Sequence, residues 1–370
     1  MGIQLVLADD WELRGDGSGD MRALQFATLR RITEIYERNG LRGSFNAEVM
    51  QQLAHRRLAG EHPELGELAA EWEDVVRGAH SRGHDFQLHV HPQWSRARYE
   101  DGRWSLDASW SMLDYPGDEV RSILREARDY LQSLLRAVNP SYRCVSYRSG
   151  SWALAPSEHT LPALAELGIV VDISMAEGLH YESPRLRIDY RGIDESFLPY
   201  YPRMDDARRV SPTPEPIVCM PTHSFRRPAA PRLIRRAAVE LRRLRVPGSG
   251  ALLRRYGRPN DVPVEPAGGE YSAWTVDGEG AAENPATDLA SMSWAELRHV
   301  LRDARSRARA TGWDDVPVVL ENHTKDIGDF GPIERLAAAL EAADDIEVIT
   351  LTELAERLEA GRYPIRAGEP

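Results

Sequence analysis

Short apolar runs alternate with amphipathic helical patterns along the whole chain. Strands are predicted at residues 3–8, 43–46, 85–91, 144–147, 169–173, 216–220, 316–321 and 346–350. Helices are predicted near residues 21–39, 66–82, 118–137, 157–167, 232–245, 293–311, 332–342 and 352–360. This alternation is typical of the βαβ units of an α/β protein.

The number of predicted strands favours one α/β architecture over another. Seven or eight strands alternating with helices suggest a single domain, residues 1–370, that folds as a closed or nearly closed (β/α) barrel. An open doubly wound sheet is the alternative. The chain has neither a GxGxxG motif after the first strand nor a GxxxxGK[ST] motif, so a nucleotide-binding fold would lack its phosphate loop.

Three longer segments interrupt this rhythm. Residues 92–117 form a predicted aromatic insertion, residues 175–215 a long loop rich in proline and tyrosine, and residues 221–290 an Arg-rich insertion that continues into a Gly/Pro/Glu stretch. Loops of this length in a compact domain are usually lids or insertions.

Composition and charge exclude several classes of protein. The 46 Lys+Arg residues against 58 Asp+Glu give a net charge of −12, which argues against a general nucleic-acid binder. Cys144 and Cys219 form no CxxC motif, which excludes a disulfide scaffold and a cysteine-ligated zinc site. No apolar run approaches the roughly 18 residues of a membrane span, and no signal-peptide pattern is present, so we expect a cytoplasmic protein.

Carboxylates follow the first predicted strand, and histidines end the third. Asp9 and Asp10 are adjacent and need a compensating cation or donor, although a solvated turn is the alternative. His89 and His91 share one strand face and could bind one metal ion. His84 has the opposite parity and is interpreted either as a residue that supports the metal ligands or as a structural residue.

Two more strand ends carry candidate chemistry. Arg148 is followed by glycine and Trp152 and could clamp a carboxylate. His323 follows another apolar strand and suits general acid–base work, since its pKa lies near neutrality. Lys325, the only lysine among 45 arginines, lies two residues further on. Asp172 ends an apolar run, where burial requires a hydrogen-bond partner.

In this order, the motifs resemble those of the polysaccharide deacetylase family, also called the NodB-homology or carbohydrate esterase family 4 group. The resemblance spans residues 5–326 and implies a distorted (β/α) barrel, often of seven strands, that binds one divalent metal ion. It implies that Asp9 is the catalytic base and Arg148 the residue that orients it, that His323 is the catalytic acid, and that Asp172 tunes His323. The implied metal ligands are Asp10, His89 and His91, and zinc is the expected ion for this donor set.

The chain also departs from the family pattern. The two histidines are two residues apart instead of the usual four, and Leu7-Ala8 replaces the Thr-Phe that normally precedes the Asp pair. Glu12 lies on the same strand face as Asp10, so it is an alternative carboxylate ligand.

The resemblance implies a metal-dependent hydrolase that removes an N-acetyl group from an amino sugar or glycan conjugate. Trp94, Trp152 and Lys325 are the expected substrate contacts, with ordinary packing as the alternative for the tryptophans. The Arg-rich insertion is either a solvated helix face or a lid for an anionic part of the substrate. Two other functions stay open, namely hydrolysis of another C–N bond in a cyclic imide or ureide, and glycan binding without catalysis.

Overall fold

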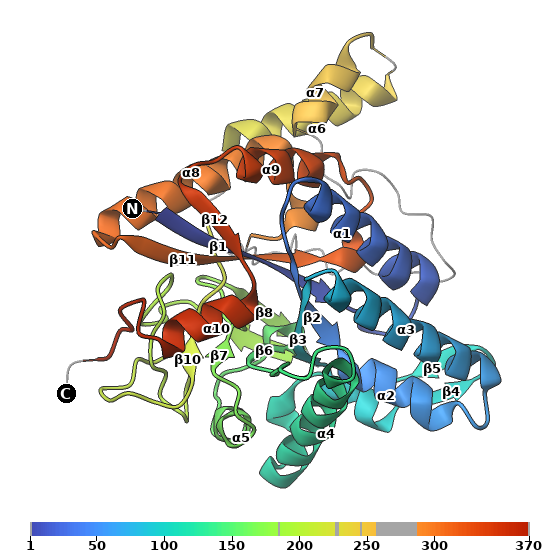
Figure 1. Cartoon of the computed structure of the whole chain (residues 1–370). Helices are drawn as coiled ribbons and strands as arrows, with labels where there is room; N and C mark the ends of the chain where they lie inside the picture. The colour runs from blue at the N-terminus through green and yellow to red at the C-terminus, as the bar shows by residue number, and fades with distance from the viewer. Residues whose placement is uncertain (1, 184–185, 226–228, 245, 257–286, 369–370) are drawn as a thin grey trace.

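The computed structural model describes residues 2–183, 186–225, 229–244, 246–256 and 287–368 (Figure 1). The central sheet contains β1 (Gly2–Trp11), β2 (Ser44–Glu48), β3 (Asp85–Val90), β6 (Ser146–Ser149), β7 (Val171–Asp172), β10 (Val218–Cys219), β11 (Asp315–His323) and β12 (Ile346–Ile349). Two hairpins lie outside it, β4 (Arg98–Glu100) with β5 (Arg103–Ser105) and β8 (His180–Ser183) with β9 (Leu186–Asp189).

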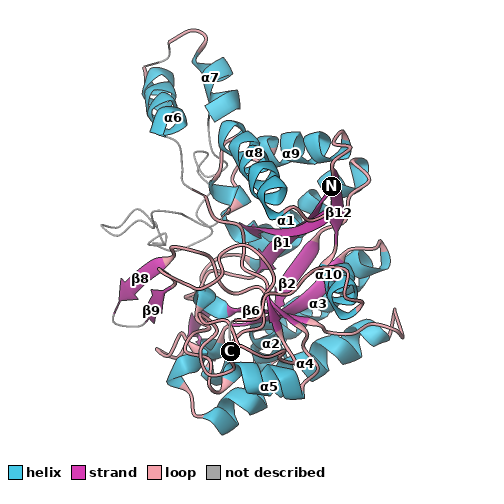
Figure 2. Cartoon of the chain, turned by 90° about the vertical axis from the view of Figure 1, so that its left-hand side faces the viewer, coloured by secondary structure: helices cyan, strands magenta, loops and turns pink. Residues whose placement is uncertain are grey.

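Helices surround the sheet (Figures 1 and 2). The surrounding helices are α1 (Thr28–Arg38), α2 (Val49–Leu58), α3 (Pro63–Ser81), α4 (Gly117–Arg136), α5 (Thr160–Glu166), α8 (Trp294–Thr311), α9 (Gly331–Glu341) and α10 (Leu351–Glu359). Two more, α6 (Ala229–Arg243) and α7 (Ser249–Tyr256), lie outside this layer next to α8. Within the described ranges, no helix combines the length and the apolar character needed to cross a bilayer.

The central sheet curls around one interior. Its strands pair in parallel in the order β10-β7-β6-β3-β2-β1-β11, and β12 lies beside the first half of β1. The chain after β10 closes the remaining gap, because Thr222 forms a bridge to Ala176 on one side and to Val319 of β11 on the other. The predicted distorted (β/α) barrel of about seven strands is confirmed.

Alternation of side chains along each strand separates two apolar layers. Val6 and Ala8 of β1 and Val319 of β11 belong to an interior cluster, whereas Leu5 and Leu7 belong to the larger core beneath the surrounding helices. Each strand of a parallel barrel therefore has an inner face and an outer face, and the parity of a residue decides which environment its side chain enters.

The predicted strands all overlap observed strands, but two helices, α2 and α7, were not predicted. Helix α2 places the polar residues Gln51, Gln52 and His55 in buried positions, which hides the apolar periodicity on which the prediction depends. Helices α6 and α7 lie in the middle of the Arg-rich insertion, and its residues 226–228, 245 and 257–286 lie outside the described residues. The start of that insertion belongs to the barrel, since Thr222 completes the sheet.

Candidate functional site

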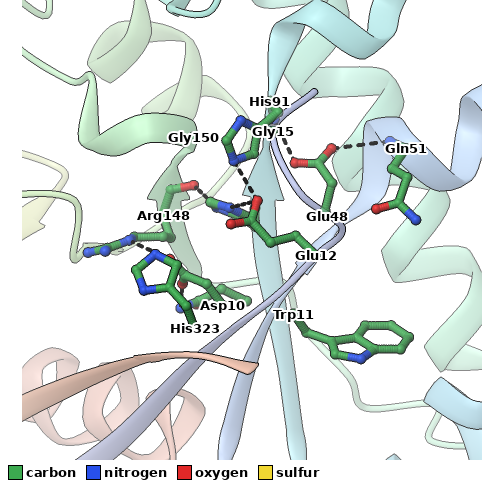
Figure 3. Close-up of polar contacts among 12 residues, drawn as sticks. Asp10, Trp11, Glu12, Gly15, Glu48, Gln51, His91, Arg148, Gly150 and His323 are labelled. Carbon is green, nitrogen blue, oxygen red and sulfur yellow. Dashed lines mark hydrogen bonds and ion pairs between the residues drawn. The ribbon is translucent and has the colours of Figure 1, made fainter. Parts of the chain in front are cut away.

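Polar side chains converge inside the barrel where its parallel strands end, the edge at which sites of such barrels form (Figure 3). Asp10 of β1 is in register with His323 of β11 on one side and with Asn46 of β2 on the other. Trp11, with the opposite parity, packs outside the barrel against Trp72 and points away from these groups in Figure 3. Strand register thus forms one row of polar groups across β11, β1 and β2.

A second row lies across β2, β3 and β6. His89 of β3 is in register with Glu48 and with Arg148. His91 follows β3 with the same parity as His89, and Gly150 makes room for it, because a Cβ at Gly150 would lie 2.8 Å from the imidazole of His91. Both rows are almost completely shielded from solvent.

Four of these side chains form a cluster with the composition of a metal site, here called the ligand cluster. One potential ligand atom from each of Glu12, Glu48, His89 and His91 lies within 4.8 Å of all the others. The Nε2 atoms of His91 and His89 lie 2.6 Å and 3.3 Å from the same carboxylate oxygen of Glu12. Two imidazoles and a carboxylate that converge in this way are a donor set typical of zinc.

The second nitrogen of each imidazole also fits this arrangement. Nδ1 of His89 lies 2.9 Å from the carbonyl oxygen of Arg148, a contact that fixes the ring and leaves Nε2 directed at the cluster. Nδ1 of His91 lies 3.1 Å from the amide nitrogen of Gln93, whose oxygen has no partner among the described residues. Rotation of that amide would let its oxygen accept a hydrogen bond from Nδ1 and leave Nε2 of His91 free to bind a cation.

Glu48 holds the backbone of the cluster. Its Oε1 accepts hydrogen bonds from the amides of Met50 and Gln51 at the start of α2, and its Oε2 accepts one from the amide of His91 at 2.7 Å. Burial raises the pKa of Glu48 to about 8, although the charge of His89 and these amide donors favour the ionised form. Glu48 therefore joins the end of β2, helix α2 and the end of β3 through one side chain.

The only lysine of the chain lies against the ligand cluster. The ammonium of Lys325 donates a hydrogen bond to Oε1 of Glu12, the oxygen that does not contact the histidines. Burial would raise the pKa of Glu12, but the charges of Lys325 and His91 hold it well below its usual range. Glu12 is consequently an anion in the interior of the barrel.

A second carboxylate is fixed beside the cluster. Asp10 accepts hydrogen bonds from Arg148 at 3.2 Å and from the amide of Asn46 at 2.8 Å. Arg148 also donates to Glu321 at 2.7 Å and to the carbonyl of Ile173 at 2.8 Å. Burial would raise the pKa of Asp10, yet the positive charge of Arg148 keeps it below the ordinary value.

The turn after β6 covers this network. Ser151 and Trp152 both adopt the left-handed backbone conformation, with φ values of 54°, which is uncommon for residues other than glycine. This turn places the Trp152 ring 5.3 Å from the guanidinium of Arg148 and 5.0 Å from the imidazole of His323. Trp152 also donates a hydrogen bond to Glu321. The predicted substrate contact Trp152 thus lies directly beside the polar network.

His323 lies between two carboxylates. Its Nε2 is 3.5 Å from Asp10, and its Nδ1 is 3.6 Å from Asp288. Burial lowers the pKa of His323, but the charges of Asp288 and Asp10 outweigh it and raise the pKa to about 9. His323 is therefore protonated at neutral pH and able to donate a proton.

Strand parity places two predicted catalytic residues elsewhere. Asp9 lies on the outer face of β1, where Tyr36 of α1 and Asn322 donate hydrogen bonds to it. Asp172 accepts hydrogen bonds from the amide and hydroxyl of Ser174, and the structure does not bring it to His323. Asp10 is the carboxylate of the pair that faces the interior, and Asp288 is the carboxylate that contacts His323.

The structure also corrects the expected environment of Trp94. Its ring lies in the outer core, 5.0 Å from Trp104 and 6.3 Å from His55, and its side chain is buried. It packs within the aromatic segment 92–117 instead of facing the interior of the barrel, which agrees with the ordinary packing alternative.

Three carboxylates of the site were missed by the sequence analysis. Glu48 is the last residue of β2, and Glu321 lies near the end of β11. Both side chains have the parity that faces the interior, a signal that could have identified them. Asp288 reaches the site through a bridge to Glu321 beside β11, and nothing in the local sequence marks that contact.

Sequence comparisons find no relative of this chain, and structural comparison finds only distant matches. No protein-family profile matches the sequence, and a search of curated proteins returns no match. A solved chain from Mycobacterium smegmatis assigned as a polysaccharide deacetylase shares 16% identity at a TM-score of 0.49, covering 99% of this chain and 93% of that one. Puue allantoinase shares 14% sequence identity at a TM-score of 0.49, and the match covers 98% of this chain and 92% of that one. A chain from Pseudomonas aeruginosa PAO1 assigned as a polysaccharide deacetylase shares 12% sequence identity at a TM-score of 0.48, and the match covers 98% of this chain and 93% of that one.

Two of these three structures carry the description of the family that the sequence motifs resemble. At these identities and TM-scores, the matches assign no function to this chain.

Proposed function

We propose that this chain is a metal-dependent hydrolase that removes an N-acyl group, in the first instance N-acetyl, from an amino sugar or glycan conjugate. The observation that carries the proposal is the buried ligand cluster beside an ionised carboxylate, Asp10, and a protonated imidazole, His323. A metal-binding donor set, a base and an acid in one interior are the groups that amide hydrolysis through water requires.

The donor set fits one divalent cation, for which zinc is the preferred ion. Glu12, His89 and His91 would hold it, with Glu12 as the carboxylate ligand in place of the expected Asp10, because Asp10 is engaged by Arg148. When bound, such an ion polarises the scissile carbonyl and lowers the pKa of water.

The chain's own groups would perform the proton transfers. Asp10 would accept a proton from the attacking water, because Arg148 keeps its carboxylate ionised and Asn46 fixes its orientation. His323 would donate a proton to the departing amine, and Asp288 would hold the imidazole in its protonated form. Trp152 would form one wall of the substrate site, since its ring contacts both His323 and Arg148.

Metal analysis followed by acetate release from a panel of N-acetylated sugars tests this function. We expect about one equivalent of metal in the wild type and none in His91→Ala. Asp10→Asn should keep the metal and lower kcat by a factor of about 10²–10⁴. Asp9→Asn is the matched control, because it changes the neighbouring carboxylate on the outer face and should retain most of the activity.

A wild-type protein without stoichiometric metal would contradict the proposal and would leave glycan binding without catalysis. Metal without acetate release would instead favour hydrolysis of a cyclic imide or ureide. The two-residue spacing of His89 and His91 supports testing that second reaction, since it differs from the spacing in the deacetylases that the motifs resemble.

A further inference from the structure

The two helices of the Arg-rich insertion expose large apolar side chains to solvent. In the part of the chain that the structure describes, six large hydrophobic residues are exposed, and four of them lie on or between α6 and α7. Leu233 and Leu244 are 61% and 74% exposed, and Val246 and Leu252 are 38% and 37% exposed. We call α6, α7 and the described residues between them the α6–α7 hairpin. Exposed apolar side chains grouped on one element mark an interaction surface more often than singly scattered ones do.

The same hairpin reverses the sign of the protein's charge. Residues 226–258 contain eleven arginines and one acidic residue, within a chain whose net charge is −12, and seven of these arginines and the acidic residue belong to the hairpin itself. Arg236, Arg242, Arg254 and Arg255 are all exposed. A positive, partly apolar surface on an acidic protein attracts an anionic partner locally while the rest of the molecule is repelled.

The hairpin stands apart from the barrel. Helices α6 and α7 pack on each other, and α7 contacts α8, as the two views in Figures 1 and 2 show. None of the described side chains of α7 is buried. The helices that cover the barrel direct their apolar faces into its core, whereas this hairpin leaves apolar side chains in contact with water.

We propose that the α6–α7 hairpin docks on the surface of an anionic lipid bilayer. Leu233, Leu244 and Leu252 would enter the boundary between headgroups and acyl chains, and the exposed arginines would contact lipid phosphates. Self-association through this face is disfavoured, because a two-fold interface would place one arginine-rich surface on another. Basic residues combined with exposed leucines on amphipathic helices are typical of helices that bind at a membrane interface.

Vesicle co-sedimentation of the full-length protein tests the proposal. We expect the protein to bind vesicles of phosphatidylcholine with 30% phosphatidylglycerol and to remain in solution with pure phosphatidylcholine. Sodium chloride should weaken the binding, since salt screens the attraction between arginine and lipid phosphate. Equal binding to both kinds of vesicle, or binding to neither, would overturn the proposal.

Matched variants locate the surface. Arg254→Glu with Arg255→Glu, and separately Leu244→Ser with Leu252→Ser, should each reduce binding by about tenfold or more. The charge control is Arg98→Glu with Arg103→Glu, which changes two exposed arginines on β4 and β5. The apolar control is Leu113→Ser with Val138→Ser, which changes two exposed apolar residues elsewhere. Neither control should reduce vesicle binding. Loss of binding in the controls to the same degree contradicts the assignment. Binding to soluble polyglutamate without binding to anionic vesicles would indicate an acidic protein partner instead.

Discussion

Asp9 and Asp10 are neighbours in the chain but lie in different environments. Asp10 faces the interior of the barrel and pairs with Arg148, whereas Asp9 faces α1 and receives a hydrogen bond from Tyr36. Burial raises the pKa of Asp9 to about 7, and the hydrogen bonds from Asn322 and Tyr36 offset only part of this effect. Asp9 is therefore a structural carboxyl group whose protonation changes near neutral pH.

This environment predicts that the difference in unfolding free energy between the wild type and Asp9→Asn depends on pH. Because the folded state binds the Asp9 proton more tightly than the unfolded state does, this group stabilises the fold at low pH, and the contribution is lost as the pH rises toward 7. Between pH 5 and pH 8 the variant should therefore gain about 2 kcal/mol in unfolding free energy relative to the wild type. Denaturant unfolding at the two pH values measures this gain, and parallel curves for the two proteins would contradict it.

His323 depends on a carboxylate that lies 35 residues before it in the chain. The charge of Asp288 raises the pKa of His323, so Asp288→Asn should lower this pKa. Since the protonated imidazole is the proposed proton donor, the alkaline limb of the kcat/KM profile should move to lower pH in the variant. The pH–rate profiles of both proteins test this shift, and Asp303→Asn, which changes a carboxylate bound to His223 instead, is the control.

At the scale of secondary structure elements, Glu48 connects three segments through its backbone contacts. Glu48→Gln replaces one acceptor oxygen by an NH₂ group that faces a donor, so the variant should lose about 1–3 kcal/mol of unfolding free energy. Metal affinity should also fall, because His91 loses its backbone anchor. Thr350→Ala removes the cap of α10 far from the ligand cluster. It should destabilise the fold by about 1 kcal/mol without changing metal affinity, and an equal loss of affinity in both variants would argue against the role of Glu48.

The strands and the inward-facing residues could largely be predicted from the sequence, because apolar runs and side-chain parity are local properties. His89 and His91 share a face for this reason, and the same rule places Glu12 beside Asp10. The same parity rule also predicts that the adjacent residues Asp9 and Asp10 face opposite sides of the strand, so that only one of them enters the interior. The resemblance to a family instead assigned chemistry to both.

The contact between Asp288 and His323 could not be predicted in this way. Asp288 belongs to no predicted strand, and it reaches β11 only because the chain passes the closing edge of the barrel, where Thr287 contacts His223. Contacts of this kind depend on how distant segments complete the sheet. Periodicity carries no information about them.

At the scale of the whole molecule, the proposed metal ion would link strands that are distant in sequence. Glu12 directly follows β1, His89 lies in β3 and His91 directly follows it, so a bound ion would resist separation of these two strands. At a free concentration of 100 times its Kd, zinc should add about 2.7 kcal/mol to the unfolding free energy. Thermal unfolding of the chelator-treated protein with and without zinc should show this increase for the wild type and not for His91→Ala. An equal increase in both proteins would indicate binding elsewhere.

The single lysine gives this protein an unusual chemical property. Every other basic side chain in the sequence is an arginine or a histidine, so amine-directed acylating reagents have one side-chain target, Lys325. That amine is buried and engaged by Glu12. Its acylation rate would therefore report how often the interior of the barrel opens. One fluorophore attached there would place a spectroscopic probe at the site without any engineered residue.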